Sequence, residues 1–398
     1  MTNNNQSNIP MSYPDITDAE RQTVMEVLHT PNLAMGPKID AFEAAIARFA
    51  GAKHAIAVNS GTAGLHLCVR AAKIEQNDLV VTTPFSFVAS TNVLVFEKAI
   101  PVFVDVDPIT GNIDPLKAAA AVHELKTGGA VARHWLPRKG AEHPGPLKAL
   151  LAVDVFGQPA DYDALRRITD AVGIKLIEDS CESLGAEYKS RKTGLLGDYG
   201  VFAFYPNKQI TTGEGGMIVT DDDAAADFMR ALRSQGRAPG DTWLQHTYLG
   251  YNYRMDEMSA ALGLVQMGRI EELLRKRQQV ADWYAERLSE IQGVEAPVLV
   301  EETTRVSWFV YVVRFDASLN RDKIAEELKR RGIPVRPYFL PIHLQPYMAD
   351  LFGYRPGDFP VTEDLGNRGL ALPFSGMMTE AQVDTVCRTL HECIMQRV

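Results

Sequence analysis

A single lysine, Lys208, lies between two short apolar segments in surroundings that suit covalent chemistry. Alternating apolar residues at 201–205 predict a strand, which ends at Pro206 because proline cannot donate to a sheet ladder. The loop TTGEGG at 211–216 follows the lysine, and a second apolar strand is predicted at 217–220. An amine held among such permissive residues can form a Schiff base with a carbonyl compound. A surface hairpin with a solvated lysine is the alternative interpretation.

The segment NSGT at 59–62 lies at a predicted junction between a strand and a helix. A helix start presents free N–H groups and a partial positive charge, and glycine lets the backbone approach a ligand closely. Gly61 and Thr62 therefore suit a phosphate group. Simple helix capping by Ser60 or Thr62 explains the same residues, so both interpretations stay open here.

Two further candidates follow predicted strands. Phe87, in the segment PFSF, would stack on a flat heteroaromatic ring if one is bound, whereas burial in the core is the alternative. Asp179 closes the apolar strand 174–177, with Glu178 beside it. Because neighbouring residues on a strand point to opposite faces, one of these two carboxylates must face the ligand side. There it would keep a pyridine nitrogen protonated, and a helix-capping role for Asp179 is the alternative.

Short apolar strands alternate with helices through the region that carries these candidates. Strands are predicted at 54–58, 79–82, 101–106, 149–156 and 174–177, and helices at 62–73, 87–97, 114–124 and 161–172. Near-continuous apolar strands separated by helices indicate a largely parallel sheet with helices on both faces. The candidate residues follow the strands, at the edge where such sheets bind ligands.

Helical patterns flank this region on both sides. Thr17 and Glu20 predict a capping box ahead of a helix that ends near residue 29. Further helices are predicted at 39–49, 256–291, 321–331 and from Thr379, with a strand at 307–315 and an aromatic loop at 336–348. We therefore expect a large domain at residues 1–255 and a smaller C-terminal α/β domain at residues 256–398.

The segment 126–146 is rich in glycine and proline, locally basic, and interrupts the pattern before the fourth strand. Long loops inside compact domains are uncommon and are often functional or mobile. We predict a solvated excursion without an assigned role.

Composition excludes several classes of protein. No apolar run approaches the roughly 20 residues that a membrane helix requires. A net charge of −9 argues against general nucleic-acid binding, which requires a basic face. The first ten residues lack the features of a secretion signal, and the four cysteines show neither zinc nor disulfide spacing. We expect a cytoplasmic protein with free, buried thiols and with no metal, membrane or nucleic-acid partner.

The candidate residues share one explanation. A phosphate-binding helix start, a stacking aromatic, a carboxylate for a ring nitrogen and a Schiff-base lysine occur in the order that pyridoxal phosphate enzymes use. The segments NSGTAGLH, TTPFSFVAS, IEDSCESLGAEY, FYPNKQITTGEGGMIVT and GYNYRMDEMSAA closely resemble the DegT/DnrJ/EryC1/StrS family of nucleotide-sugar aminotransferases, from about Ile9 to the last helix. The resemblance implies an α/β fold of the PLP-dependent aspartate-aminotransferase type (fold type I), with a large, mostly parallel-sheet domain and a smaller C-terminal α/β domain.

The resemblance implies a cofactor site for pyridoxal 5'-phosphate. Lys208 would bind the cofactor and then move protons between the cofactor carbon and the sugar carbon. Asp179 would pair with the pyridine nitrogen, and Phe87 would stack on the ring. Gly61 and Thr62 would contact the phosphate.

The resemblance also implies a homodimer with shared active sites. Asn252 would reach the cofactor phosphate of the neighbouring subunit. Arg254, Tyr338 and His343 would lie near the nucleotide sugar. The active unit would then need two copies of the chain.

Two positions depart from the family pattern. Ala203 stands where many members have a serine that contacts the cofactor phosphate, so Ser60 or the partner subunit's Asn252 would compensate. Glu182 stands where many members have glutamine or histidine. An ionised carboxylate near the ring hydroxyl would be repulsive, so Glu182 is either protonated or turned away. Lys208 is intact, unlike in the dehydratase branch of the family, where histidine replaces it.

These matches predict an aminotransferase that moves an amino group from L-glutamate to a keto-deoxyhexose linked to a nucleoside diphosphate. The TTGEGG and TTPFSFVAS segments resemble members that aminate C4 more than members that aminate C3. A keto-cyclitol acceptor is an alternative within the class. A non-catalytic regulatory protein that retains the fold is the alternative from another class.

Overall fold

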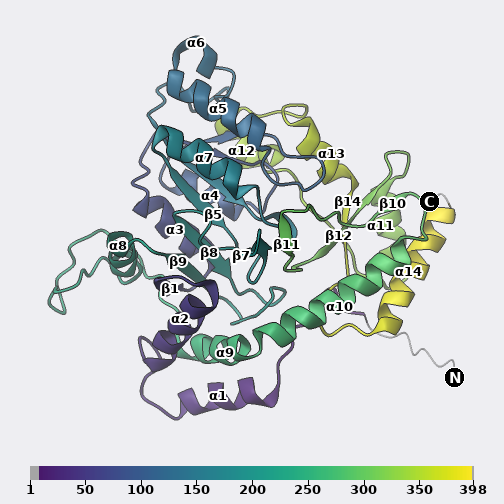
Figure 1. The fold of residues 1–398 in the computed structure, drawn as a ribbon, viewed down its shortest axis with the longest axis horizontal. Coiled ribbons are helices and arrows are strands. Elements are labelled where there is room, and N and C mark those ends of the chain that lie inside the picture. The colour runs from purple at the N-terminus through teal and green to yellow at the C-terminus, as the bar shows by residue number, and fades with distance from the viewer. Residues whose placement is uncertain (1–8, 397–398) are drawn as a thin grey trace.

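The structure, a computed structural model, describes residues 9–396 and centres on a seven-stranded sheet (Figure 1). The strands are β1 (His54–Val58), β2 (Leu79–Thr82), β3 (Ile100–Phe103), β4 (Leu147–Val153), β5 (Lys175–Asp179), β8 (Tyr199–Ala203) and β9 (Gly216–Thr220), in the spatial order β1-β9-β8-β5-β4-β2-β3. The pairs β3–β2, β2–β4, β4–β5 and β5–β8 are parallel, whereas β9 is antiparallel to β8 and β1. The predicted, mostly parallel sheet is therefore confirmed.

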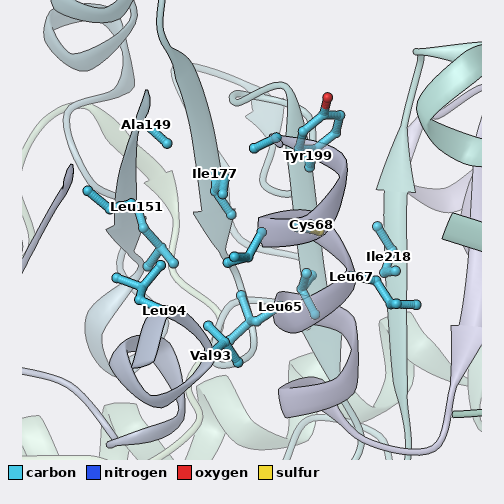
Figure 2. Packing of buried hydrophobic residues seen from close by; sticks show 14 of the residues in the cluster. Leu65, Leu67, Cys68, Val93, Leu94, Ala149, Leu151, Ile177, Tyr199 and Ile218 are labelled. Carbon is cyan, nitrogen blue, oxygen red and sulfur yellow. The ribbon is translucent and has the colours of Figure 1, made fainter. Parts of the chain in front are cut away.

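Both faces of this sheet are buried, because alternate residues of each strand enter different hydrophobic clusters. Leu151 and Ile177 pack on one face, against α3 (Gly61–Ala71), α4 (Ala89–Phe96) and α8 (Asp223–Arg233). Figure 2 shows Leu65 of α3 and Val93 of α4 beside these strands. The other face is covered by α5 (Pro115–Thr127) and α7 (Tyr162–Val172), and towards β1 and β9 by α2 (Pro37–Ala50). Each fully buried aliphatic side chain stabilises the fold by about 1.5–3 kcal/mol.

The C-terminal part has its own four-stranded sheet and its own core. The sheet contains β10 (Val294–Glu295), β12 (Tyr311–Phe315), β14 (Gly369–Leu372) and β13 (Arg336–Pro337). The helices α11 (Arg321–Arg330) and α14 (Glu380–Met395) contribute to its hydrophobic cluster. The predicted capping box of Thr17 and Glu20 is confirmed ahead of α1 (Asp18–Leu28). Thr379, predicted as the start of the last helix, forms a second capping box ahead of α14.

The single helix predicted at 256–291 is wrong, because two helices occupy this region. α9 (Glu257–Gly268) and α10 (Ile270–Leu288) are separated at Arg269, which has a non-helical φ of −111°. The Arg269 guanidinium pairs with Asp15 at 2.9 Å and with Glu20 at 2.8 Å. These contacts tie the break to the N-terminal segment, which lies far away in the sequence. Hydrophobic periodicity runs through both helices and therefore could not locate the break.

Helix α10 connects the two cores. In Figure 1 it runs from α9 to α14. Leu273 and Leu274 near its start pack in the cluster of α2 and β1, whereas Tyr284 and Leu288 near its end pack in the C-terminal cluster. The division into residues 1–255 and 256–398 therefore stays a prediction at its boundary.

Most residues of the segment 126–146 are exposed, as predicted for a solvated excursion, but the segment is also anchored to the C-terminal part. It begins in the last turn of α5, contains the short helix α6 (Gly129–Ala132), contacts the end of α12 (Pro346–Phe352) at Lys139 and leads into β4. Arg138 forms two hydrogen bonds with Asp358, at 2.5 and 2.7 Å, and the Lys139 amide donates to the Phe352 carbonyl at 3.1 Å. The sequence could not reveal this anchoring, because Asp358 and Phe352 lie more than 200 residues away from the segment.

Several features were predicted to be absent. In the range 9–396, no helix is both long and apolar enough to cross a bilayer. Within the same residues, no group of histidine, cysteine or carboxylate side chains is arranged to hold a metal ion. Cys68, Cys387 and Cys393 are buried free thiols, as predicted, whereas Cys181 is only partly buried.

Candidate active site

A cavity of about 440 Å³ lies beyond the carboxyl ends of β1, β2, β5 and β8, at the predicted edge of the sheet. The predicted residues that line it are Gly61, Thr62, Phe87, Asp179, Glu182, Lys208 and Tyr338. Asn252, Arg254 and His343 do not line it. Residues from five separate segments therefore converge on one hollow, as a small-molecule site requires.

Lys208 is held inside this cavity. Its side chain is 12% exposed, and its Nζ lies 3.8 Å from Oε1 of Glu182. The same Nζ lies 3.7 Å from the centre of the Phe309 ring. The Lys208 amide donates to the Tyr205 carbonyl at 2.9 Å, which turns the chain after β8. The alternative of a surface hairpin with a solvated lysine is therefore wrong.

Asp179, and not Glu178, faces the cavity. Its Oδ2 accepts a hydrogen bond from the Ser90 hydroxyl at 2.6 Å, and its Oδ1 accepts one from the Cys181 amide at 3.2 Å. No α-helix follows β5 directly, so the helix-capping alternative is wrong. Asp179 remains nearly buried, and its free acceptor positions are directed to the cavity.

Glu182 is directed towards the cavity and not away from it. Its Oε2 accepts a hydrogen bond from the Phe156 amide at 2.9 Å. Burial raises the pKa of Glu182, although the nearby Lys208 ammonium opposes this shift. Of the two possibilities left by the sequence, a side chain turned away from the cavity is therefore wrong, and a protonated carboxyl, which could donate a hydrogen bond, stays a prediction.

The start of α3 forms the part of the cavity predicted to bind a phosphate. The Ser60 hydroxyl accepts a hydrogen bond from the Ala63 amide at 3.1 Å, so Ser60 is the N-cap of the helix, and its own O–H remains available. A side chain at Gly61 would place Cβ 2.8 Å from Cβ of Ala203 and 2.9 Å from Sγ of Cys181. Glycine is therefore required where α3 begins against the end of β8.

Phe87 is 62% exposed and lies on the wall of the cavity, whereas Phe85, two residues earlier, is buried in the core. The core alternative thus holds for Phe85 and is wrong for Phe87. An exposed aromatic face on a cavity wall suits stacking on a flat ring.

Comparison with known proteins agrees with this geometry. The model of the DegT/DnrJ/EryC1/StrS aminotransferase family matches residues 14–391. The chain belongs to this family. It is 36% identical to GDP-perosamine synthase of Caulobacter vibrioides over 97% of this chain and 98% of the relative. It is 34% identical to the spore coat polysaccharide biosynthesis protein SpsC of Bacillus subtilis, over 97% of each chain.

The fold comparison leads to the same family. The structure of the Helicobacter pylori aminotransferase PseC, involved in the biosynthesis of pseudoaminic acid, superimposes with a TM-score of 0.86 at 26% identity. The match covers 98% of this chain and 100% of PseC. The predicted fold, aspartate-aminotransferase-like and of type I, is confirmed, and the protein is a pyridoxal-phosphate-dependent aminotransferase of a sugar aminotransferase family.

The residues present fit pyridoxal phosphate. Asp179 offers carboxylate oxygens to a ring nitrogen, and Phe87 offers an aromatic face. The unpaired amides at the start of α3 offer donors to a phosphate, beside the available hydroxyl of Ser60. Lys208 supplies the amine at the same cavity. Ser60 thus stands where it can compensate for the missing serine at Ala203.

The predicted residues outside the cavity lie in different surroundings. Asn252 is exposed, and its carbonyl accepts a hydrogen bond from the Asn59 side chain at 3.4 Å. Arg254 is partly exposed two residues later. His343 is fully buried, and its Nε2 lies 3.0 Å from Oε1 of Glu363. In one copy of the chain, His343 therefore supports the loop and does not reach the cavity.

Among the residues that line the cavity and that sequence reasoning missed are Ser90, Phe309 and Arg336. Ser90 belongs to the TTPFSFVAS segment, where only the aromatic residue was singled out. Arg336 opens the aromatic loop predicted at 336–348, which also contains the predicted residues Tyr338 and His343, so its position carried a signal. Phe309 carried none, because it precedes β12 in an apolar stretch typical of a core strand.

Proposed function

We propose that the enzyme transfers an amino group from L-glutamate to C4 of a keto-deoxyhexose linked to a nucleoside diphosphate. One observation carries the choice of an anionic substrate. Arg336 is exposed where the cavity meets an adjoining hollow of about 200 Å³, and no ion pair with a carboxylate is formed by Arg336 among residues 9–396. A free guanidinium at the entrance attracts both a dicarboxylate donor and a diphosphate.

The likeness to GDP-perosamine synthase and to SpsC supports a sugar acceptor. The preference for C4 rests on the TTGEGG and TTPFSFVAS segments. A keto-cyclitol acceptor has no diphosphate and would leave Arg336 without a partner in that half of the reaction. Binding of a nucleoside diphosphate, compared with binding of a free cyclitol, distinguishes the two acceptors.

The chain's own residues supply orientation and proton transfer. When bound, pyridoxal phosphate would supply an electron sink for the carbon that loses or gains a proton. Asp179, oriented by Ser90 and the Cys181 amide, would hold the proton on the ring nitrogen. Lys208 would hold the cofactor, and its amine would move a proton between the reacting carbons. Positioned acid–base catalysis of this kind accelerates a reaction by about 10²–10⁴-fold.

Glu182 has a separate task in this proposal. Its neutral carboxyl donates a hydrogen bond to the cofactor's ring oxygen, which the glutamine or histidine of many relatives would contact instead. The raised pKa of Glu182, caused by its burial, favours that neutral form. Glu182→Gln, which keeps a donor, should preserve activity, whereas Glu182→Ala should lower it.

The homodimer with shared active sites is also part of the proposal. Asn252 is exposed and lies outside the cavity of its own chain, as expected for a residue that serves a second subunit. Beside it, the loop 236–250 exposes Trp243 at 77%, Leu244 at 84% and Leu249 at 83%, which a partner would bury.

Mixing inactive Lys208→Ala and Asn252→Ala chains tests this arrangement. If each site takes Lys208 from one chain and Asn252 from the other, a mixed dimer contains one site with both residues intact and regains activity. If each site takes both residues from the same chain, every site of the mixed dimer carries a substitution and stays inactive.

Single-turnover transfer tests the substrate. The enzyme is loaded with the amine form of the cofactor and mixed with candidate nucleotide keto sugars, with L-glutamate tested in the reverse loading step. Transfer to a 4-keto-6-deoxyhexose bound to a nucleoside diphosphate is expected. If no amino group is transferred to any of these sugars, the assignment of a nucleotide-linked keto sugar as the acceptor is contradicted. Arg336→Met should raise KM for the nucleotide sugar and leave cofactor binding unchanged.

A further inference from the structure

Arg277 is buried behind the active-site lysine and has no carboxylate partner among residues 9–396. It projects from α10 and is 5% exposed. Its Nη1 donates to the carbonyls of Trp308 at 3.1 Å and Phe309 at 3.3 Å. Its Nη2 donates to the carbonyl of Asn207 at 3.1 Å and to that of Lys208. One guanidinium thus joins two main-chain segments at four carbonyl oxygens.

This arrangement is costly and differs from that of another buried arginine. Arg233 is 7% exposed but pairs with Glu43 at 2.5 Å. Arg277 has no such counter-charge, and burial lowers its pKa to about 10. A buried charge without a counter-ion costs several kcal/mol unless hydrogen bonds offset it. An apolar side chain would fill the space without this cost, so the four hydrogen bonds are the feature that requires arginine.

The two joined segments carry groups that meet in the cavity. One is 207–208, which contains the lysine, and the other is 308–309, whose Phe309 ring lies 3.7 Å from Lys208 Nζ. Gln209 makes a second connection of the same kind. Its Nε2 donates to the carbonyls of Glu182 at 2.6 Å and Ser307 at 2.9 Å. The segment before β12 is therefore fastened to the lysine loop from two sides.

We propose that Arg277 is a positioning residue for the transamination step, because it fixes the main chain of Lys208 relative to Phe309. This inference rests on the proposed role of Lys208 in proton transfer. A lysine side chain has several rotatable bonds, so the reach of its amine depends on where its main chain is held. A displacement of about 1 Å at a reacting group can cost about a hundredfold in rate.

The first test uses protein without cofactor, and therefore does not depend on any substrate. Hydrogen–deuterium exchange is measured on peptides that cover 205–210 and 306–310. Arg277→Met should speed exchange in both peptides. Arg275→Met, two residues away on the exposed side of the same helix, is the matched control and should leave both unchanged. Unchanged exchange in Arg277→Met would overturn the proposal.

The second test separates positioning from folding and from charge. In the holoenzyme, Arg277→Met should lower kcat by about 10–100-fold, with KM for both substrates within about twofold of wild type. Arg277→Lys keeps the charge and the aliphatic stem but has one nitrogen, which cannot join both segments. It should therefore show the same loss of kcat, and it serves as the test variant if Arg277→Met does not fold.

Full activity in Arg277→Lys would contradict the positioning role, because charge alone would then suffice. The yield of cofactor fixed to Lys208 by borohydride gives a readout without the acceptor. A reduced yield in both variants is expected, and a wild-type yield in both would overturn the proposal. If no nucleotide sugar accepts an amine, the proposed function fails, whereas the exchange and fixation results still decide the role of Arg277.

Discussion

Glu178 and Asp179 are neighbours on β5, and both are buried, but their surroundings differ. Glu178 accepts hydrogen bonds from the amides of Gly194, Leu196 and Gly197 and from the Ser180 hydroxyl, which together fill its two oxygens. Asp179 accepts two hydrogen bonds, and its remaining acceptor positions are directed to the cavity. A carboxylate saturated by its own chain stabilises the fold, whereas one left open towards a cavity is available to a ligand.

The face of Glu178 also contains a second buried acid. The Ser180 hydroxyl lies 2.8 Å from Oδ2 of Asp154 and 2.8 Å from Oε1 of Glu178. A hydroxyl donates only one hydrogen, so a carboxyl proton must complete the second hydrogen bond. Burial, and the neighbouring Glu178, raise the pKa of Asp154. Burial also raises the pKa of Glu178, but the hydrogen bonds that Glu178 accepts from three backbone amides favour its ionised form, so we assign the proton to Asp154.

The largest expected effect is on the open side of β5. Asp179→Asn removes the charge that keeps the ring nitrogen protonated, and should lower kcat/KM by about 10²–10⁴-fold. The unfolding free energy of the cofactor-free protein should change little. Steady-state kinetics and chemical denaturation measure the two quantities. Activity close to that of wild type in Asp179→Asn would show that the Asp179 carboxylate has no role in the reaction.

The matched change one residue earlier should have the opposite profile. Glu178→Gln turns an NH₂ group towards amide donors, and should lower the unfolding free energy by about 2–5 kcal/mol. Activity per folded molecule should stay near that of wild type. Denaturant unfolding with kinetics on the folded fraction checks both. Loss of activity with unchanged stability in Glu178→Gln would contradict this comparison of the two carboxylates.

The pH dependence of stability sharpens the role of Asp154. Its pKa is raised by folding, so the native state holds a proton that the unfolded chain releases above pH about 4. This group's contribution to stability is therefore present at low pH and is lost as the pH rises towards the raised pKa. Asp154→Asn, which cannot ionise, should flatten this slope in unfolding experiments between mildly acidic and alkaline pH. An unchanged slope would show that Asp154 is ionised.

Two hydroxyl deletions give the smallest expected effects. Ser90→Ala removes a hydrogen bond to Asp179 and should weaken cofactor binding by about 1 kcal/mol, or roughly fivefold. Ser183→Ala removes a hydrogen bond to Asp154 on the other face, and should change stability but not cofactor affinity. Spectroscopic titration with pyridoxal phosphate measures the difference. Equal affinities in the two variants would contradict it.

The alternation of β5 explains how much the sequence could reveal. It predicted that one of Glu178 and Asp179 faces the ligand, and local patterns located β1 and β2 with the observed bounds. Which of the two carboxylates faces the ligand depends on which side of the sheet carries the cavity. The loop after β8 and the segment at Phe309 line the cavity and so determine on which side it lies. Both belong to other parts of the chain, which the pattern of β5 cannot reveal.

Contacts between distant segments account for the remaining differences. The break at Arg269 depends on Asp15, and the anchoring of the 126–146 segment depends on Asp358. The burial of His343 depends on a pairing with Glu363 that no local pattern indicates. Arg277 was not singled out from the sequence, because its partners are main-chain carbonyls of the distant lysine loop.

The identity of the cofactor-binding lysine tests the central claim most directly. The protein with bound pyridoxal phosphate is reduced with borohydride, digested and examined by mass spectrometry, with Lys208→Ala as the control. We predict that the cofactor is fixed to the peptide that contains Lys208 and that the variant fixes none. Fixation at another lysine, or equal labelling of the variant, would contradict the assignment of this cavity as the active site.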